Sequence, residues 1–112
     1  MDISYEYPNI ALGRIKGNMD NAKSYHVYSE ISKCIRKKLN IILDMKECTF
    51  ITSTGMRTLT LLSKICNQKG IKMVIIRLDD YIEDILRVTG FDTGFTICNT
   101  IDTALLIMNE EE

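Results

Sequence analysis

The sequence contains one histidine, one proline, no marked excess of either charge and no long apolar run. Because Lys and Arg do not outnumber Asp and Glu, the chain has little attraction for the phosphates of a nucleic acid, and DNA binding is not expected. No apolar stretch approaches the ~20 residues that span a bilayer, and the amino terminus lacks the basic and apolar regions of a secretory signal. We therefore expect a cytoplasmic protein with no membrane contact.

Cysteine and histidine are too scattered in the sequence to suggest a metal site. The four cysteines form no C-x-x-C pair, and at this length folding needs no disulfide framework. Each lies within or beside an apolar segment, where a reduced thiol packs as a small hydrophobe. These cysteines are Cys34, Cys48, Cys66 and Cys98. The sequence therefore predicts neither a metal nor a cofactor.

The composition that remains is that of an ordinary globular protein. Of the 112 residues, 46% are hydrophobic and 26% are charged, and this length suits one hydrophobic core. The chain has no internal repeat and no interior stretch rich in Pro, Gly or Ser. We expect residues 1–112 to form one domain.

The hydrophobic pattern predicts two short strands followed by alternating helices and strands. The predicted strands cover residues 3–7, 10–15, 41–43, 73–76 and 95–98. The predicted helices begin at Asp20 or Asn21, after the turn that ends at Gly55, at Asp79 or Asp80, and at Asn99; the first ends near 36–38, the next two at Gly70 and Gly90. This order predicts an α/β fold with one mostly parallel, mixed sheet of about five strands and about four helices. We expect residues 41–43 at its centre and the first strands at an antiparallel edge.

The turn between the central strand and the second helix carries three adjacent hydroxyls, Thr52, Ser53 and Thr54. In an open α/β sheet, functional residues collect beyond the carboxyl ends of the strands. A phosphate on Ser53 would meet the unpaired N–H groups and the positive dipole of the helix N-terminus. A second interpretation is that these hydroxyls only cap the helix, with Ser53 accepting a hydrogen bond from the N–H of Gly55 or Met56.

Three segments of the chain resemble the STAS domains of bacterial anti-sigma factor antagonists. They are Gly17-Asn18-Met19-Asp20, the stretch Ile-Ile-Leu-Asp-Met-Lys-Glu-Cys-Thr-Phe-Ile-Thr-Ser-Thr-Gly-Met at 41–56, and Ile85-Leu86-Arg87-Val88-Thr89-Gly90-Phe91-Asp92. With the order of the predicted elements, the resemblance covers essentially the whole chain and implies a STAS-like fold. The family's turn reads Asp-Ser-Ser/Thr-Gly-Leu. Ser53, Thr54 and Gly55 match it, whereas Thr52 stands in place of the aspartate.

The resemblance implies a protein-interaction switch and not an enzyme. In the family, the serine that corresponds to Ser53 is phosphorylated by a partner that is both a serine kinase and an anti-sigma factor. The unphosphorylated antagonist binds this partner and frees the sigma factor. The resemblance also implies a serine phosphatase, Thr54 as an alternative acceptor, and a surface that binds the partner. That surface comprises Asp20, Thr52, Thr54, Gly55, Met56 and Arg57.

Four other residues near the turn can also be interpreted from the sequence. Arg57 could fold back onto a phosphate at Ser53, or it could be a solvated surface arginine. Met56 is the residue of the apolar helix stripe nearest the turn, and we expect it to stay exposed as an adaptable contact. Asp44 and Glu47 resemble solvated acids beside a turn more than an acid–base pair.

Two alternatives to the switch remain open on sequence grounds. Because Thr52 replaces the aspartate, the chain could be an unphosphorylated STAS scaffold or a small-ligand sensor in a regulatory or transport complex. A hydrolase with Ser53 as nucleophile would need a nearby base and an oxyanion hole. The chain lacks the G-x-S-x-G motif of serine hydrolases. Its one histidine, His26, is distant from Ser53 in sequence, and we interpret it as a packing or surface residue.

Overall fold

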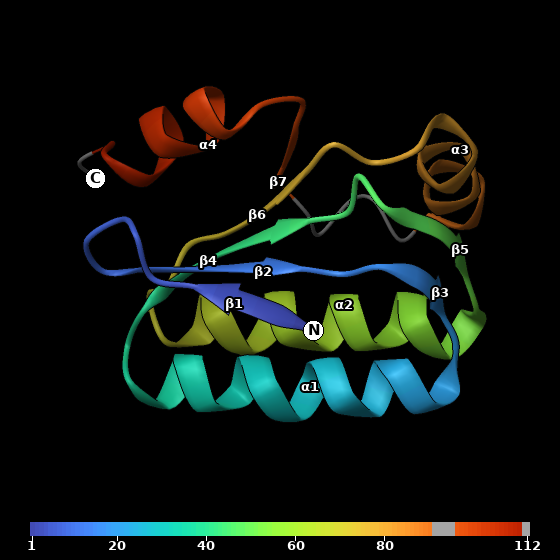
Figure 1. Cartoon of the computed structure of the whole chain (residues 1–112), viewed down its shortest axis with the longest axis horizontal. Helices are drawn as coiled ribbons and strands as arrows, with labels where there is room; N and C mark the ends of the chain where they lie inside the picture. The colour runs from blue at the N-terminus through green and yellow to red at the C-terminus, as the bar shows by residue number, and fades with distance from the viewer. Residues whose placement is uncertain (91–95, 111–112) are drawn as a thin grey trace.

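The computed structural model describes residues 1–90 and 96–110. Its main sheet has five strands in the order β1-β2-β4-β6-β7 (Figure 1). These strands span Asp2–Ser4, Ile10–Arg14, Asn40–Asp44, Met73–Ile76 and Thr96–Cys98. β1 runs antiparallel to β2, and the other neighbouring strands run parallel. The predicted mixed sheet with an antiparallel edge is confirmed, although the first strand ends at Ser4 and its predicted extension to residue 7 is wrong.

β4 occupies the centre of the sheet because its side chains are covered on both faces. Ile41 and Leu43 point into the larger core cluster and Ile42 into the smaller one, and all three are fully buried. An unbroken apolar run is what such a doubly covered strand requires. The predicted central position of this segment is therefore correct.

The described part of the chain has four helices packed around the sheet, in agreement with the number that the sequence predicts. α1 (Asn21–Arg36) and α2 (Ser53–Gln68) lie side by side on one face, whereas α4 (Ile101–Met108) lies on the other and α3 (Asp80–Thr89) stands at one end (Figure 1). None of the helices in the described part of the chain combines the length and the apolar character needed to cross a bilayer.

Most helix ends follow the sequence signals. Asp20 caps α1, Asp79 caps α3, and Gly90 ends α3 with φ +79°, a conformation that glycine adopts without strain. The predicted cap at Asn99 is wrong, because Thr100 caps α4 by accepting a hydrogen bond from the N–H of Thr103 at 3.1 Å. The predicted first residue of the last strand and two residues of the third family-like segment lie outside the described residues. They are Phe95, Phe91 and Asp92.

A second, two-stranded sheet was missed by the sequence analysis. β3 (Gly17–Met19) and β5 (Cys48–Ile51) pair in parallel, so much of the predicted turn at 46–55 is a strand. β5 buries only its first and last residues and exposes the two between, a pattern that fits neither an alternating nor a fully buried strand. This small sheet places the chain before α1 beside the chain before α2.

Candidate functional site

Ser53 is the first residue of α2, and its side chain is exposed. Its hydroxyl makes no hydrogen bond within the described part of the chain. The expectation that Ser53 caps the helix is wrong, because Thr52 occupies the N-cap position. The Ser53 hydroxyl is therefore accessible to solvent, at a helix end where the dipole favours negative charge.

Thr52 uses both hydrogen-bonding capacities of its hydroxyl. The oxygen accepts from the N–H of Gly55 at 3.1 Å, and the proton can be donated to the Met19 carbonyl at 3.3 Å or to Asn21 Oδ1 at 3.4 Å. The backbone N–H of Thr52 also donates to the Met19 carbonyl, at 3.1 Å. An ionised aspartate could cap the helix but could not donate to a carbonyl. Thr52 therefore orders the turn in a way that its replacement by the family's aspartate would change.

We expect Thr52→Val to lower the free energy of unfolding by about 1–2 kcal/mol, because the variant loses the helix cap and the side-chain hydrogen bond to Met19 or Asn21. Thr52→Asp keeps a cap but loses the donor, so it should lie between Thr52→Val and the unsubstituted protein. Thr58→Val is the matched control: Thr58 lies within the same helix, is half-buried and makes no hydrogen bond through its side chain in the described chain. Urea unfolding measures all three, and equal losses for the two valine variants would contradict the role assigned to Thr52.

Gly55 and Met56 are buried, which changes their expected roles. A Cβ at Gly55 would lie 2.7 Å from Ile51 Cγ1 and 2.9 Å from the Met19 carbonyl oxygen, so only glycine allows this close approach of α2 to β3 and β5. Met56 is 6% exposed, and the expectation that it remains open to a partner is wrong. Its sulfur lies 3.9 Å from the Thr89 hydroxyl on α3. Both residues therefore support the turn from its buried side.

The other predicted site residues lie on the surface around Ser53. Thr54 is half-buried, and Arg57 is exposed and makes no ion pair or hydrogen bond through its side chain among the described residues. Asp20 is exposed at the start of α1, where its carboxylate accepts from the N–H of Lys23 at 2.9 Å. The β3–β5 pairing aligns Met19 with Ile51. It thereby brings the Asp20 turn beside the Ser53 turn, although the two are 33 residues apart in sequence.

Two features of this surface were not foreseen. Phe50 is 44% exposed and lies three residues before Ser53 in the sequence, so an exposed apolar ring precedes the Ser53 hydroxyl closely along the chain. Thr49 donates to Asn18 Oδ1 at 3.3 Å across the small sheet. The sequence signal for Phe50 was an aromatic residue inside a polar stretch, and its meaning depended on the unrecognised strand.

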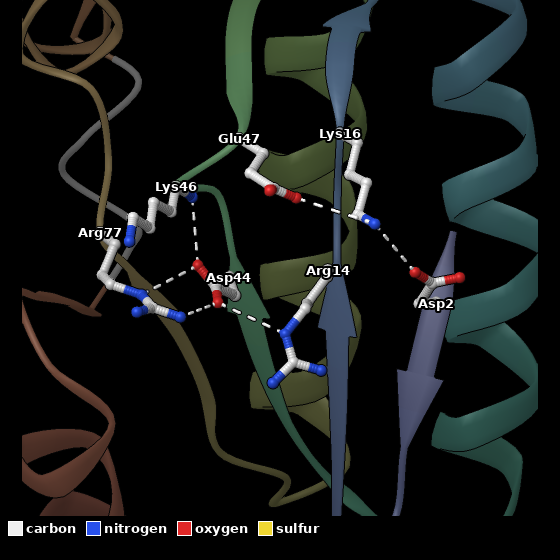
Figure 2. A network of polar contacts seen from close by, with 7 residues as sticks. All are labelled: Asp2, Arg14, Lys16, Asp44, Lys46, Glu47 and Arg77. Atoms are coloured by element: carbon white, nitrogen blue, oxygen red, sulfur yellow. Dashed lines mark hydrogen bonds and ion pairs between the residues drawn. The ribbon is translucent and has the colours of Figure 1, made fainter.

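Asp44 anchors the end of the main sheet beneath the loop that leads to this site (Figure 2). Arg77 Nε donates to Asp44 Oδ1 at 3.2 Å and Arg77 Nη2 donates to Oδ2, while Arg14 Nε lies 3.8 Å from Oδ2 and the Lys46 N–H donates to Oδ1 at 3.1 Å. The hydrogen bonds from Arg77 to the Asp44 carboxylate raise the pKa of Arg77 above its ordinary value. Asp44 is 3% exposed, so the expectation that it is a solvated acid is wrong.

Glu47, by contrast, is the solvated acid that the sequence suggests. Its carboxylate is exposed and lies 3.8 Å from Lys16 Nζ, which also lies 3.3 Å from Asp2 (Figure 2). Exposed ion pairs of this kind contribute little to stability. Glu47 and Asp44 therefore differ in environment although they are three residues apart.

The cysteines and the histidine show no catalytic arrangement in the described part of the chain. Three cysteines are buried and one is half-buried, all as free thiols, and burial raises the pKa of the Cys66 thiol to about 11. Cys66 is therefore protonated at neutral pH and packs as an apolar group. His26 Nε2 lies 3.2 Å from the amino-terminal nitrogen, and no hydrogen bond joins it to Ser53.

The sequence is similar to a known domain family and to a known protein. A family model described as the STAS domain matches residues 3–104. BtrV of Bordetella bronchiseptica, a candidate anti-sigma factor antagonist, is 22% identical over 91 residues, which cover 80% of this chain and 78% of that protein.

Two solved structures share the fold. A candidate anti-sigma factor antagonist of Thermotoga maritima superposes with a TM-score of 0.89 at 14% identity, covering 97% of this chain and 94% of that one. The Bacillus cell fate determinant SpoIIAA in its phosphorylated form superposes with a TM-score of 0.74 at 13% identity, covering 96% and 98%. Since the family model spans nearly the whole sequence, the chain belongs to the STAS domain family.

Proposed function

We propose that this chain is an anti-sigma factor antagonist whose binding to an anti-sigma factor is controlled by phosphorylation of Ser53. The observation that carries the proposal is the exposed hydroxyl of Ser53 at the N-terminus of α2, which has no hydrogen-bond partner among the described residues. The resemblance of the whole chain to proteins of this description supports the same function. In this proposal residues 1–112 act as one module, and the partner is a serine kinase that is also the anti-sigma factor.

The neighbouring hydroxyls support Ser53 as the acceptor. The Thr52 hydroxyl is engaged as helix cap and as donor, and Thr54 is half-buried. A kinase must bring the acceptor oxygen in line with the γ-phosphate, which requires an accessible hydroxyl. Ser53 is the exposed one of the three.

Phosphorylation would oppose binding through charge. A phosphoserine adds about −1.5 to −2 charges, and an interface formed around a neutral hydroxyl must then desolvate or pair that charge. A penalty of ~3 kcal/mol weakens a complex about a hundredfold. In this mechanism the unphosphorylated form holds the anti-sigma factor, and a serine phosphatase restores that form.

The module is proposed to have no catalytic activity of its own. Serine nucleophiles need a base within hydrogen-bond reach. In the described chain Ser53 has no such contact, and His26 is engaged with the amino terminus instead.

The test is phosphorylation by the cognate kinase with Mg-ATP, with the modified residue located by mass spectrometry. We expect one phosphate on Ser53, none on Ser53→Ala, and normal modification of Thr54→Val, which is the matched hydroxyl control. Phosphate that persists on Ser53→Ala would contradict the proposed acceptor. An unmodified protein in the presence of an active kinase would favour the second candidate function, an unphosphorylated STAS scaffold.

A further inference from the structure

A hollow of about 630 Å³ lies at the opposite end of α2 from Ser53, bordered by α2, β6, β7 and α4. Its volume falls in the range of small-molecule sites. Thr60, Lys64 and Asn67 line it from one face of α2, since they are spaced four and three residues apart. It shares no lining residue with the surface around Ser53, and the proposed switch makes no use of it.

The lining of the hollow is positively charged. Among the residues that the structure describes, it includes two lysines and no aspartate or glutamate. Lys72 is already engaged, because its Nζ donates to the carbonyl oxygens of Ile107 at 3.0 Å and Glu110 at 2.6 Å. The exposed Lys64 makes no hydrogen bond or ion pair through its side chain among the described residues. An ammonium group without an internal partner therefore stands at the rim, where an anion is the complementary ligand.

The other lining side chains are apolar or neutral. Ile71 and Met73 are each 8% exposed, and Ile107 of α4 is half-buried. The Thr60 hydroxyl donates to the Met56 carbonyl at 3.0 Å, so its oxygen remains an acceptor only. A ligand that fits the hollow thus needs an apolar part over these side chains and a negative group near Lys64.

We propose that this hollow binds a small organic anion, a carboxylate attached to an aliphatic chain. The carboxylate pairs with Lys64 Nζ, and the chain covers the apolar surface of Ile71, Met73 and Ile107. The site gives the chain a ligand-binding capacity that is separate from phosphorylation, because its residues lie one or more helical turns away from the N-terminus of α2.

Octanoate is a suitable probe, titrated into the full isotope-labelled chain while amide resonances are followed by NMR. We expect saturable shifts confined to residues that line the hollow. Lys64→Gln should weaken binding by about fivefold, the effect of one partly exposed ion pair. Lys69→Gln is the matched control, because Lys69 is exposed near the same end of α2 but does not line the hollow. It should leave octanoate binding unchanged.

Two further ligands separate the charge from the apolar part. Octanamide keeps the aliphatic chain of octanoate but has no charge. It should bind the unsubstituted protein about as weakly as octanoate binds the Lys64→Gln variant. Inorganic phosphate, which has the charge but no aliphatic chain, should bind the unsubstituted protein more weakly than octanoate does. Absence of saturable shifts in the hollow, equal effects of the two lysine substitutions, or phosphate binding as tightly as octanoate would each overturn the proposal. Ser53→Ala should bind octanoate normally, so this test and the phosphorylation test can fail independently.

Discussion

Ser53→Asp is expected to weaken binding to the anti-sigma factor kinase by about tenfold to a hundredfold in a calorimetric titration. The carboxylate places one negative charge where the proposed interface receives a neutral hydroxyl, and desolvating an unpaired charge is costly. The loss should be smaller than that caused by phosphate, which carries more charge. Ser53→Ala should retain the partner, because it keeps the site neutral.

Two control variants isolate the charge at this position. Ser53→Asn matches the shape of Asp without its charge and should retain most of the affinity. Gln68→Glu makes the same change in net charge at the last residue of α2, about 22 Å along the helix, and should have little effect.

Loss of folding would not explain the expected result. A negative charge in the first turn of a helix is stabilising, so Ser53→Asp should unfold at the same urea concentration as the unsubstituted protein or higher. Equal affinities of the Asp, Asn and Ala variants would contradict a charge-controlled interface.

Asp44→Ala should lower the free energy of unfolding by about 2–3 kcal/mol, a larger loss than we expect from any exposed acid in the chain. Removal of the carboxylate leaves Arg77 and the Lys46 N–H without their acceptor. We expect a smaller loss of unfolding free energy than for a wholly buried ion pair, because the side chains of Arg14 and Arg77 are 37% and 33% exposed and can be hydrated in the variant.

Glu47→Ala is the control for the buried acid. It removes a carboxylate three residues away whose side chain is 60% exposed, so its effect should stay within about 0.5 kcal/mol. Urea unfolding measures both variants, and the slope of the free energy of unfolding against urea concentration should stay unchanged. If Asp44→Ala were no more destabilised than Glu47→Ala, the network would not anchor the sheet.

The main sheet and the helices could be predicted from the sequence because their signals are local. The apolar run at 41–43 and the apolar stripe of α2 at Leu59 and Leu62 are patterns within a single segment, and each predicts its element without knowledge of the segment's partners. Gly90 likewise marks a helix end through its own backbone preference. The order of these elements along the chain then predicted a mostly parallel sheet with an antiparallel edge, and the resemblance to STAS domains implied a fold of the same class.

The small sheet and the buried acid could not be predicted because their causes lie in distant partners. β5 is a strand because it pairs with β3, although two of its four residues face solvent. Asp44 is buried because β2 aligns Arg14 beside it and Arg77 directly follows its other neighbour, β6. A basic residue at the end of each flanking strand was the available signal, and it has meaning only once the strand order is known.

In the candidate site, too, some features could be predicted from the sequence and others depended on distant residues. Ser53 was found from its motif and its place after a strand, and the structure adds that its hydroxyl is exposed and makes no hydrogen bond to any residue that the structure describes. Thr52 was identified as a departure from the family, but its role as a hydrogen-bond donor depends on Met19 and Asn21, which the small sheet brings near. Met56 was misassigned because helical spacing does not reveal that Thr89 of α3 lies against its sulfur.

The most direct test of the switch is a calorimetric titration of the anti-sigma factor kinase with one preparation of this protein, before and after phosphorylation of Ser53, with ADP present in place of ATP. The account predicts a saturable complex with the unmodified protein and affinity lower by about a hundredfold after modification. Equal affinities of the two forms would contradict it.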